Sequence, residues 1–215
     1  MKTYTCFDGN RRIATGSLDS IALIFKRAIE GSAVGPVLIF DDDTGRSYDI
    51  DIRGADEEVV ARVSNSMATD ESEIHGGSST AASESANTEG PGDGPRGRGR
   101  PKLGVVPREV TLLPRHWEWL ATQPGGASVA LRKLVEEARR VHADKDKMRQ
   151  AHERTYHFMS AMAGDLPGYE EAIRALFADD ESKFGSLIGN WPDDIRHHAT
   201  WLAYRDRSRN APSNA

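Results

Sequence analysis

Three arginines recur at every second position of a short basic run, Arg96, Arg98 and Arg100, and Pro101 and Lys102 follow directly. A slim, extended backbone with glycine between arginines fits deep in the minor groove of DNA. There the negative potential of narrow A·T tracts attracts arginine. The proline would keep the backbone extended, and the lysine ammonium would reach a phosphate. The run therefore predicts binding to DNA through an A·T-rich minor groove.

The core of this run, residues 98–101, resembles an AT-hook. The resemblance implies that Arg98 and Arg100 enter the groove. Gly99 lies between them, and a larger side chain there would keep the backbone off the groove floor. The alternative is a basic, flexible linker in which arginine and glycine coincide.

The charge of the chain is segregated along its length, although the net charge is only −5. Residues 64–95 carry six acidic residues and no Lys or Arg, whereas residues 96–143 carry ten basic and four acidic residues. A basic segment of this kind indicates a polyanionic partner. The alternative is a solvated tail of one charge that folds back on the segment of opposite charge.

Residues 108–141 carry a strand–helix–helix pattern. Val110–Leu113 predicts a short strand, Arg115–Thr122 a first helix, and Ser128 the start of a second helix that extends to about residue 141. The pattern resembles a ribbon-helix-helix unit. In that fold the strands of two chains pair into a ribbon that enters the major groove. The alternative is a packing unit inside a larger fold.

The ribbon-helix-helix resemblance implies further DNA contacts and a homodimer. Arg108 and Thr111 would lie on the ribbon, and Ser128 would lie at the helix end that faces a phosphate. A lone ribbon strand leaves an unpaired edge, which pairing with a second chain removes. We therefore expect a homodimer through residues 108–141.

The chain as a whole predicts an α+β fold with a small N-terminal ββαββ domain over residues 1–63. Its expected elements are strands at Thr3–Phe7, Arg12–Thr15, Val37–Phe40 and Arg46–Ile52, a helix capped by Ser17, and a short helix over Glu57–Val63. Residues 64–107 predict a disordered linker, because their few large apolar residues cannot offset the loss of chain entropy. The basic run, residues 95–104, lies within it.

Residues 108–205 predict the ribbon-helix-helix-like unit followed by a helical region, and residues 206–215 a flexible tail. The helices expected after residue 143 are Asp144–Ala163, Tyr169–Ala178, Glu181–Ile188 and a last helix that begins at Pro192.

No catalytic site emerges from the sequence, and we expect no enzyme activity, no cofactor and no bound metal. Cys6 is the one cysteine and indicates core packing in a strand. Asp41–Asp43 fit a hairpin turn rather than the spacing of an EF-hand. The glycine spacing of residues 92–97 matches a dinucleotide fingerprint but lacks the flanking strand and helix. We expect the histidines, His197 and His198 among them, to be surface or hydrogen-bonded core residues.

We expect from the sequence that the protein is cytoplasmic, and association with the nucleoid is compatible with this expectation. The first twelve residues contain no apolar signal-peptide core, and the apolar runs are too short to cross a bilayer. We therefore expect no membrane partner.

Four stretches are similar to an uncharacterised bacterial family, best known from proteobacteria, over nearly the full length. They are GRPKLGVV at 99–106, REVTLLPRHWEWL at 108–120, GGASVALRKL at 125–134 and FMSAMAGD at 158–165. The family has no established reaction or ligand, so the resemblance implies only a bacterial cytoplasmic protein. The residues themselves favour a dimeric DNA-binding regulator or nucleoid-associated protein. The alternative is a non-enzymatic interaction module whose basic run binds an acidic partner.

Overall fold

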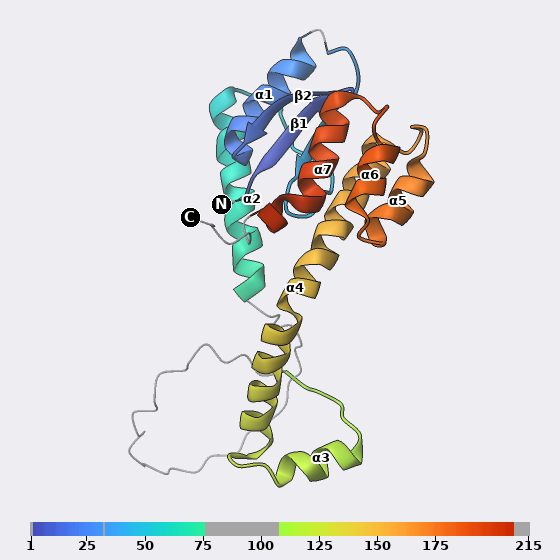
Figure 1. The fold of residues 1–215 in the computed structure, drawn as a ribbon. Helices are drawn as coiled ribbons and strands as arrows, with labels where there is room; N and C mark the ends of the chain where they lie inside the picture. Colours follow the sequence, from blue (N-terminus) through green and yellow to red (C-terminus); the bar gives the residue numbers. More distant parts are fainter. Residues whose placement is uncertain (1, 32, 76–107, 209–215) are drawn as a thin grey trace, which may run out of the picture. The chain divides into compact units, whose positions relative to one another are not determined.

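The computed structural model describes residues 2–31, 33–75 and 108–208, which adopt an α+β fold (Figure 1). The chain divides into two compact units. We call residues 1–76 with 142–215 the sheet unit, and residues 77–141 the α3 unit. This grouping differs from the predicted division into residues 1–63 and 108–205, because helices after residue 142 share a core with the N-terminal sheet.

The sheet unit contains a three-stranded antiparallel sheet in the order β2-β1-β3. The strands are β1 (Tyr4–Asp8), β2 (Arg11–Gly16) and β3 (Val37–Asp41). Gly9 lies in the turn between β1 and β2 with a φ of 55°, which glycine adopts without a Cβ clash. All five residues of β1 are buried, because helices cover both faces of this central strand.

Two helices cover one face of the sheet, α1 (Leu18–Glu30) and α2 (Asp56–His75) (Figure 1). Ser17 occupies the predicted cap position before the first of them, but its side chain makes no capping hydrogen bond, and Gly31 follows the last residue of this helix. Alternate strand side chains and one stripe of each helix form the core on this face: Tyr4, Cys6, Leu18, Ile21, Ala22, Ile39, Val59 and Val63.

Four helices supply the second core of the sheet unit: the part of α4 (Gly126–Met162) that follows residue 142, α5 (Tyr169–Phe177), α6 (Glu181–Leu187) and α7 (Asp193–Ser208). The intervening strand side chains Phe7 and Phe40 point to this face. They pack edge-on to each other at 6.0 Å and contact Phe158 of α4. The two ends of the described chain therefore complete one core.

The predicted fourth strand, Arg46–Ile52, is wrong. Only a single bridge between Phe40 and Ser47 extends the sheet on this side. Beyond this bridge the backbone carbonyl oxygens of Asp51 and Arg53 accept hydrogen bonds from the Arg62 guanidinium of α2. This part of the segment is therefore hydrogen-bonded to a helix and not to a strand. That helix also continues to His75, past the predicted start of the linker at residue 64.

The predicted break between two helices near residue 142 is also wrong, because α4 runs unbroken over 37 residues. No glycine or proline occurs between residues 127 and 163, so nothing in the backbone ends the helix. The last helix continues into the predicted tail as far as Ser208, where Arg154 binds Asp206 with an N–O distance of 2.7 Å. The short helices α5 and α6 lie within one residue of their predicted bounds.

The α3 unit consists, in its described part, of a segment from residue 108, α3 (Pro114–Ala121) and the first turns of α4. The predicted strand Val110–Leu113 is wrong for the single chain, because no described segment pairs with it. Both helices begin slightly earlier than predicted, the first at Pro114, whose fixed φ suits a helix start.

Cys6 is fully buried in β1, which confirms its predicted place in the core. Burial, and secondarily the Asp8 carboxylate, raise the pKa of the Cys6 thiol to about 11. The thiol is therefore neutral at physiological pH and is a poor nucleophile.

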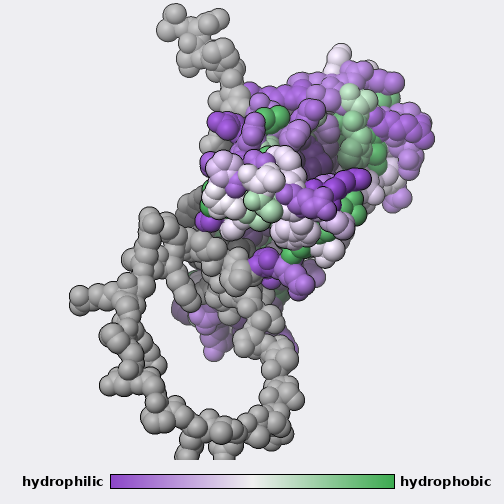
Figure 2. Space-filling view, turned by 90° about the horizontal axis from the view of Figure 1, so that it is seen from below, coloured by the Kyte–Doolittle hydropathy of each residue, from purple (hydrophilic) through white to green (hydrophobic). Residues whose placement is uncertain are grey.

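Hydrophilic residues predominate on the face shown in Figure 2, and hydrophobic residues reach that face only in limited patches. Within the described ranges, no helix combines the length and the apolar character needed to cross a membrane.

Candidate functional site

Three of the residues predicted to contact DNA lie in the α3 unit, and the structure leaves all three exposed: Arg108, Thr111 and Ser128. The other predicted contacts, Arg96, Arg98, Gly99, Arg100, Pro101 and Lys102, lie outside the described residues. Arg108 and Thr111 precede α3 in a segment without helix or strand. Ser128 is in the first turn of α4.

A guanidinium lies beside the first turn of α4. The Nε of Arg132 donates to the Ser128 carbonyl oxygen at 3.1 Å, and its Nη2 donates to Ser128 Oγ at 3.4 Å. Backbone N–H groups at a helix start favour an anion, and a neighbouring guanidinium adds to that preference. Lys133 and Arg140 are exposed further along α4. This part of the helix has the donors that a phosphate needs.

The α3 unit buries little of its apolar surface. Between residues 108 and 141 only Leu120 and Ala130 are buried. An open apolar cavity of about 280 Å³ is lined by Leu112, His116, Trp119, Leu120, Leu131 and Leu134. Large apolar side chains stay exposed around it, and Trp119 is half exposed. Apolar surface of this extent, with so small a core, is typical of a segment that packs against a partner.

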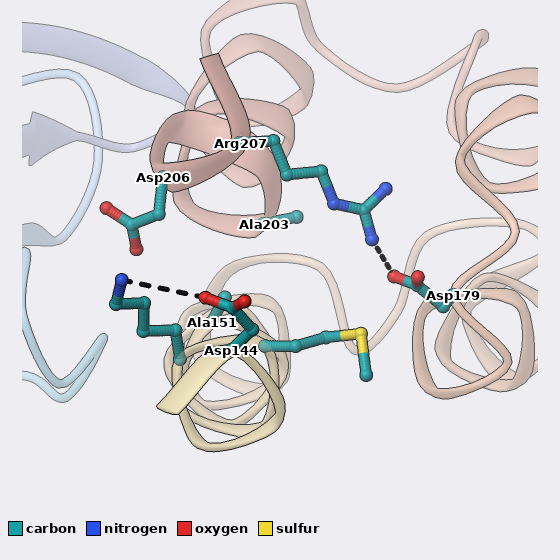
Figure 3. Close-up of a pocket in the computed structure, with 8 residues that line it drawn as sticks. Asp144, Ala151, Asp179, Ala203, Asp206 and Arg207 are labelled. Atoms are coloured by element: carbon teal, nitrogen blue, oxygen red, sulfur yellow. Dashed lines mark hydrogen bonds and ion pairs between the residues drawn. The ribbon is translucent and has the colours of Figure 1, made fainter. Parts of the chain in front are cut away.

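A second cavity, of about 430 Å³, lies in the sheet unit between α4 and α7 (Figure 3). Its rim consists of charged side chains that already pair: Arg207 binds Asp179, and Lys147 lies 3.8 Å from Asp144. Figure 3 shows Arg207 reaching from α7 toward Asp179, with Ala151 and Ala203 between the two helices. Because its charges bind one another, this cavity offers a ligand few free donors.

A third cavity, also in the sheet unit, lies over a buried pair that the sequence analysis missed. Asp42 is fully buried and His198 is 1% exposed. Their Oδ1 and Nε2 atoms are 3.4 Å apart, and neither makes a hydrogen bond within the residues that the structure describes. We expected both histidines to be surface or hydrogen-bonded core residues. This is confirmed for His197, which is exposed, and it is wrong for His198, which is buried without a hydrogen bond among the described residues.

The other Asp42 oxygen belongs to a chain of hydroxyl groups. Thr5 Oγ1 donates to Asp42 Oδ2 at 3.1 Å and lies 3.0 Å from Thr15 Oγ1. The chain links the buried carboxylate to an exposed threonine on β2. The sequence signal was an acidic turn directly after a buried strand, but nothing local relates that turn to a helix near residue 198.

In the ranges given above, no group of three or more His, Cys, Asp or Glu side chains is arranged to bind a metal ion. Among the histidines, His152 is buried and bonds Asp179 at 3.2 Å. Burial, and then the nearby Arg46, lower the pKa of His157 below its ordinary value.

Fold and site together define an α+β protein with a buried Asp–His pair in the sheet unit and a cationic, partly apolar α3 unit. The chain belongs to the family described as "Uncharacterized protein conserved in bacteria (DUF2239)", whose model matches residues 3–203. The predicted membership of an uncharacterised bacterial family is thus confirmed. No curated protein and no solved structure matches the chain.

Proposed function

We propose that the protein binds DNA as a homodimer, in the role of a bacterial regulator or nucleoid-associated protein. The observation that carries the proposal is the run Arg96 to Lys102, in which arginine and glycine alternate before a proline. Such a run suits a narrow A·T minor groove. The exposed Arg108, Thr111 and Ser128 in the α3 unit support it, because a second contact to the same duplex would involve them.

In this proposal the start of α4 beside Ser128 contacts a DNA phosphate. Arg132 already places a guanidinium at this turn, and the backbone N–H groups there are the type of donor that ribbon-helix-helix proteins direct at DNA. The segment before α3 pairs with no strand among the described residues, and it would gain strand hydrogen bonds by pairing with a second copy.

Arg100→Ala is expected to weaken binding to an A·T-rich duplex by about 1–3 kcal/mol, the range of a good arginine contact in a groove. Gly99→Leu should have a similar effect, because its side chain would keep the backbone off the groove floor. Lys102→Ala should weaken binding to A·T-rich and G·C-rich duplexes equally and lower the salt slope by about one, as a lost phosphate contact does. The measurement is fluorescence anisotropy on both duplexes at several salt concentrations.

The matched control is Lys145→Ala, which removes an exposed positive charge from the sheet unit and should leave both affinities unchanged. If Arg100→Ala binds both duplexes as the unaltered protein does, the run is a linker. The protein would then be better explained as an interaction module whose basic run binds an acidic partner.

The proposed dimer predicts a second result. Trp119→Glu should raise the dimer dissociation constant at least about tenfold, because a charge replaces a large apolar side chain where the α3 unit lacks a covering. Sedimentation equilibrium of the full chain measures this, and Val34→Glu, a change at a 90% exposed position of the sheet unit, is the control. A monomer at micromolar concentration before any substitution would exclude the dimer but not the minor-groove contact.

A further inference from the structure

The buried pair Asp42–His198 lies beneath a cavity of about 660 Å³ in the sheet unit. The cavity is lined by Thr5, Arg12, Ile13, Ala14, Thr15, His197, His198 and Trp201. It is formed mainly by β2 and α7, which contact each other, and Thr5 of β1 also lines it. Its volume falls in the range of sites for small organic molecules.

Beneath this cavity lie buried polar atoms that make no hydrogen bond. Neither ring nitrogen of His198 makes a hydrogen bond to any part of the chain described above, and neither does Asp42 Oδ1. Native proteins leave few buried polar atoms unpaired, because such an atom has lost its hydrogen bonds to water without gaining others. In the tautomer whose Nε2–H faces Asp42, Nδ1 is left as a hydrogen-bond acceptor. A ligand with a hydroxyl or amino group would satisfy it.

The charges around the cavity favour an anion with a single charge. No Asp or Glu is among the lining residues, whereas Arg12 is. Its backbone N–H donates to Asp194 Oδ2 at 2.9 Å, but in the described parts of the chain no carboxylate pairs with its guanidinium. A free guanidinium binds a carboxylate through two parallel hydrogen bonds. Asp194 nearby and Asp42 beneath the cavity would repel a doubly charged group such as a phosphate monoester.

One wall of the cavity is apolar. Trp201 contributes to it together with Ile13 and Ala14. The indole is fixed in place, because the His198 ring stacks on it with centroids 5.4 Å apart and the Arg205 guanidinium lies 4.4 Å from its centroid. The wall would accept the apolar body of a ligand.

We propose that this cavity is a binding site for a small monocarboxylic acid with an apolar body and a hydroxyl or amino group near the carboxylate. The Arg12 guanidinium binds the carboxylate, His198 accepts the hydrogen bond of the hydroxyl or amino group, and Trp201 contacts the apolar body. Asp42 is a positioning residue, since it fixes the tautomer and orientation of His198 and is itself oriented by Thr5.

Isothermal titration calorimetry of the full chain tests the proposal with three probes that differ by one group each. 3-Phenyllactate has the carboxylate, the hydroxyl and the apolar body, 3-phenylpropionate lacks the hydroxyl, and 3-phenylpropane-1,2-diol lacks the carboxylate. The expected result is binding of 3-phenyllactate at least about tenfold tighter than either of the others. Without the hydroxyl the buried His198 lacks its hydrogen bond, and without the carboxylate no ion pair forms with Arg12. Equal affinities, or no heat with 3-phenyllactate, would overturn the proposal. So would tighter binding of phenyl phosphate.

A pair of neighbouring arginines on β2 provides the matched variants. Arg12→Gln is expected to weaken 3-phenyllactate binding about tenfold without affecting the fold, because the side chain is exposed. Arg11→Gln removes the same charge from the next residue, which pairs with Asp8 outside the cavity, and should leave the affinity unchanged. An unchanged affinity in Arg12→Gln, or an equal loss in both variants, would contradict the assignment.

Discussion

Gly45→Ala is expected to lower the free energy of unfolding by about 2–5 kcal/mol. Gly45 ends the acidic turn after β3 with a φ of 66°, a conformation that costs an L-residue about 1–2 kcal/mol. A Cβ at this position would also overlap the backbone carbonyl of Arg154 in α4, and a helix backbone does not move aside as the end of a flexible side chain does. Overpacking of this kind adds roughly 1–3 kcal/mol.

The control for this variant is Gly9→Ala. Gly9 has a similar φ of 55°, but a Cβ there would meet its nearest atom at an ordinary 3.7 Å. It should therefore lose only about 1–2 kcal/mol from the backbone conformation. Urea unfolding of both variants, followed by far-UV circular dichroism, gives the difference. Equal losses would show that the acidic turn does not pack on α4 as described.

Arg154→Met is expected to lower the free energy of unfolding by about 2–4 kcal/mol, because it leaves the carbonyl oxygen of the buried Leu202 without its donor and removes the ion pair with Asp206. Arg154 is 6% exposed. Its Nε donates to the Leu202 carbonyl oxygen and its Nη2 to Asp206 Oδ2, both at 2.7 Å. Burial lowers the pKa of this guanidinium, and the bond to Asp206 partly offsets that effect.

Arg149→Met tests whether burial explains the loss. Arg149 pairs with Asp146 at 3.1 Å and Glu153 at 3.4 Å, but its side chain is 61% exposed. Exposed pairs on a helix contribute only about 0.3–0.5 kcal/mol. Thermal and urea unfolding should show a clearly larger loss of stability for Arg154→Met than for Arg149→Met. Similar small losses for both variants would mean that the hydrogen bonds of Arg154 do not stabilise the packing of α7 on α4.

The elements governed by local patterns could be predicted from the sequence. Val37–Phe40 is a continuous apolar run between turn residues, and it forms β3. The spacing of Ile21, Ile24, Phe25 and Ala28 indicated one apolar face. Ile21 is buried on the sheet and Phe25 packs against that core, whereas Ile24 and Ala28 are half-buried. The uncharged, fully buried Cys6 also followed from its place in a strand.

The local sequence pattern gave a wrong prediction where the backbone conformation depends on a side chain from another element. The alternation of residues 46–52 is typical of a strand, but Arg62 binds the carbonyl oxygens there. The unbroken α4 was missed for a different reason. Its polar middle suggested an end, although only a glycine, a proline or a competing cap would have ended the helix.

The candidate ligand site could not be predicted, because its parts come from opposite ends of the sequence. Asp42 follows β3, whereas His198 lies in α7, and each is unremarkable among its neighbours. Burial without a hydrogen bond is what distinguishes His198, and burial depends on how α7 packs against the sheet. The proposed contact with DNA stays a prediction from the sequence, because the four adjacent residues that carry its chemistry lie outside the described residues.

The shared core of the sheet unit affects the order in which the molecule can fold. The strands that carry Phe7 and Phe40 are synthesised well before the helices that carry Phe158 and Leu202. Until those helices emerge from the ribosome, one apolar face of the sheet is left without a cover. We expect the nascent chain to depend on chaperones over this interval, and to reach its native state slowly, since long-range contacts must form last.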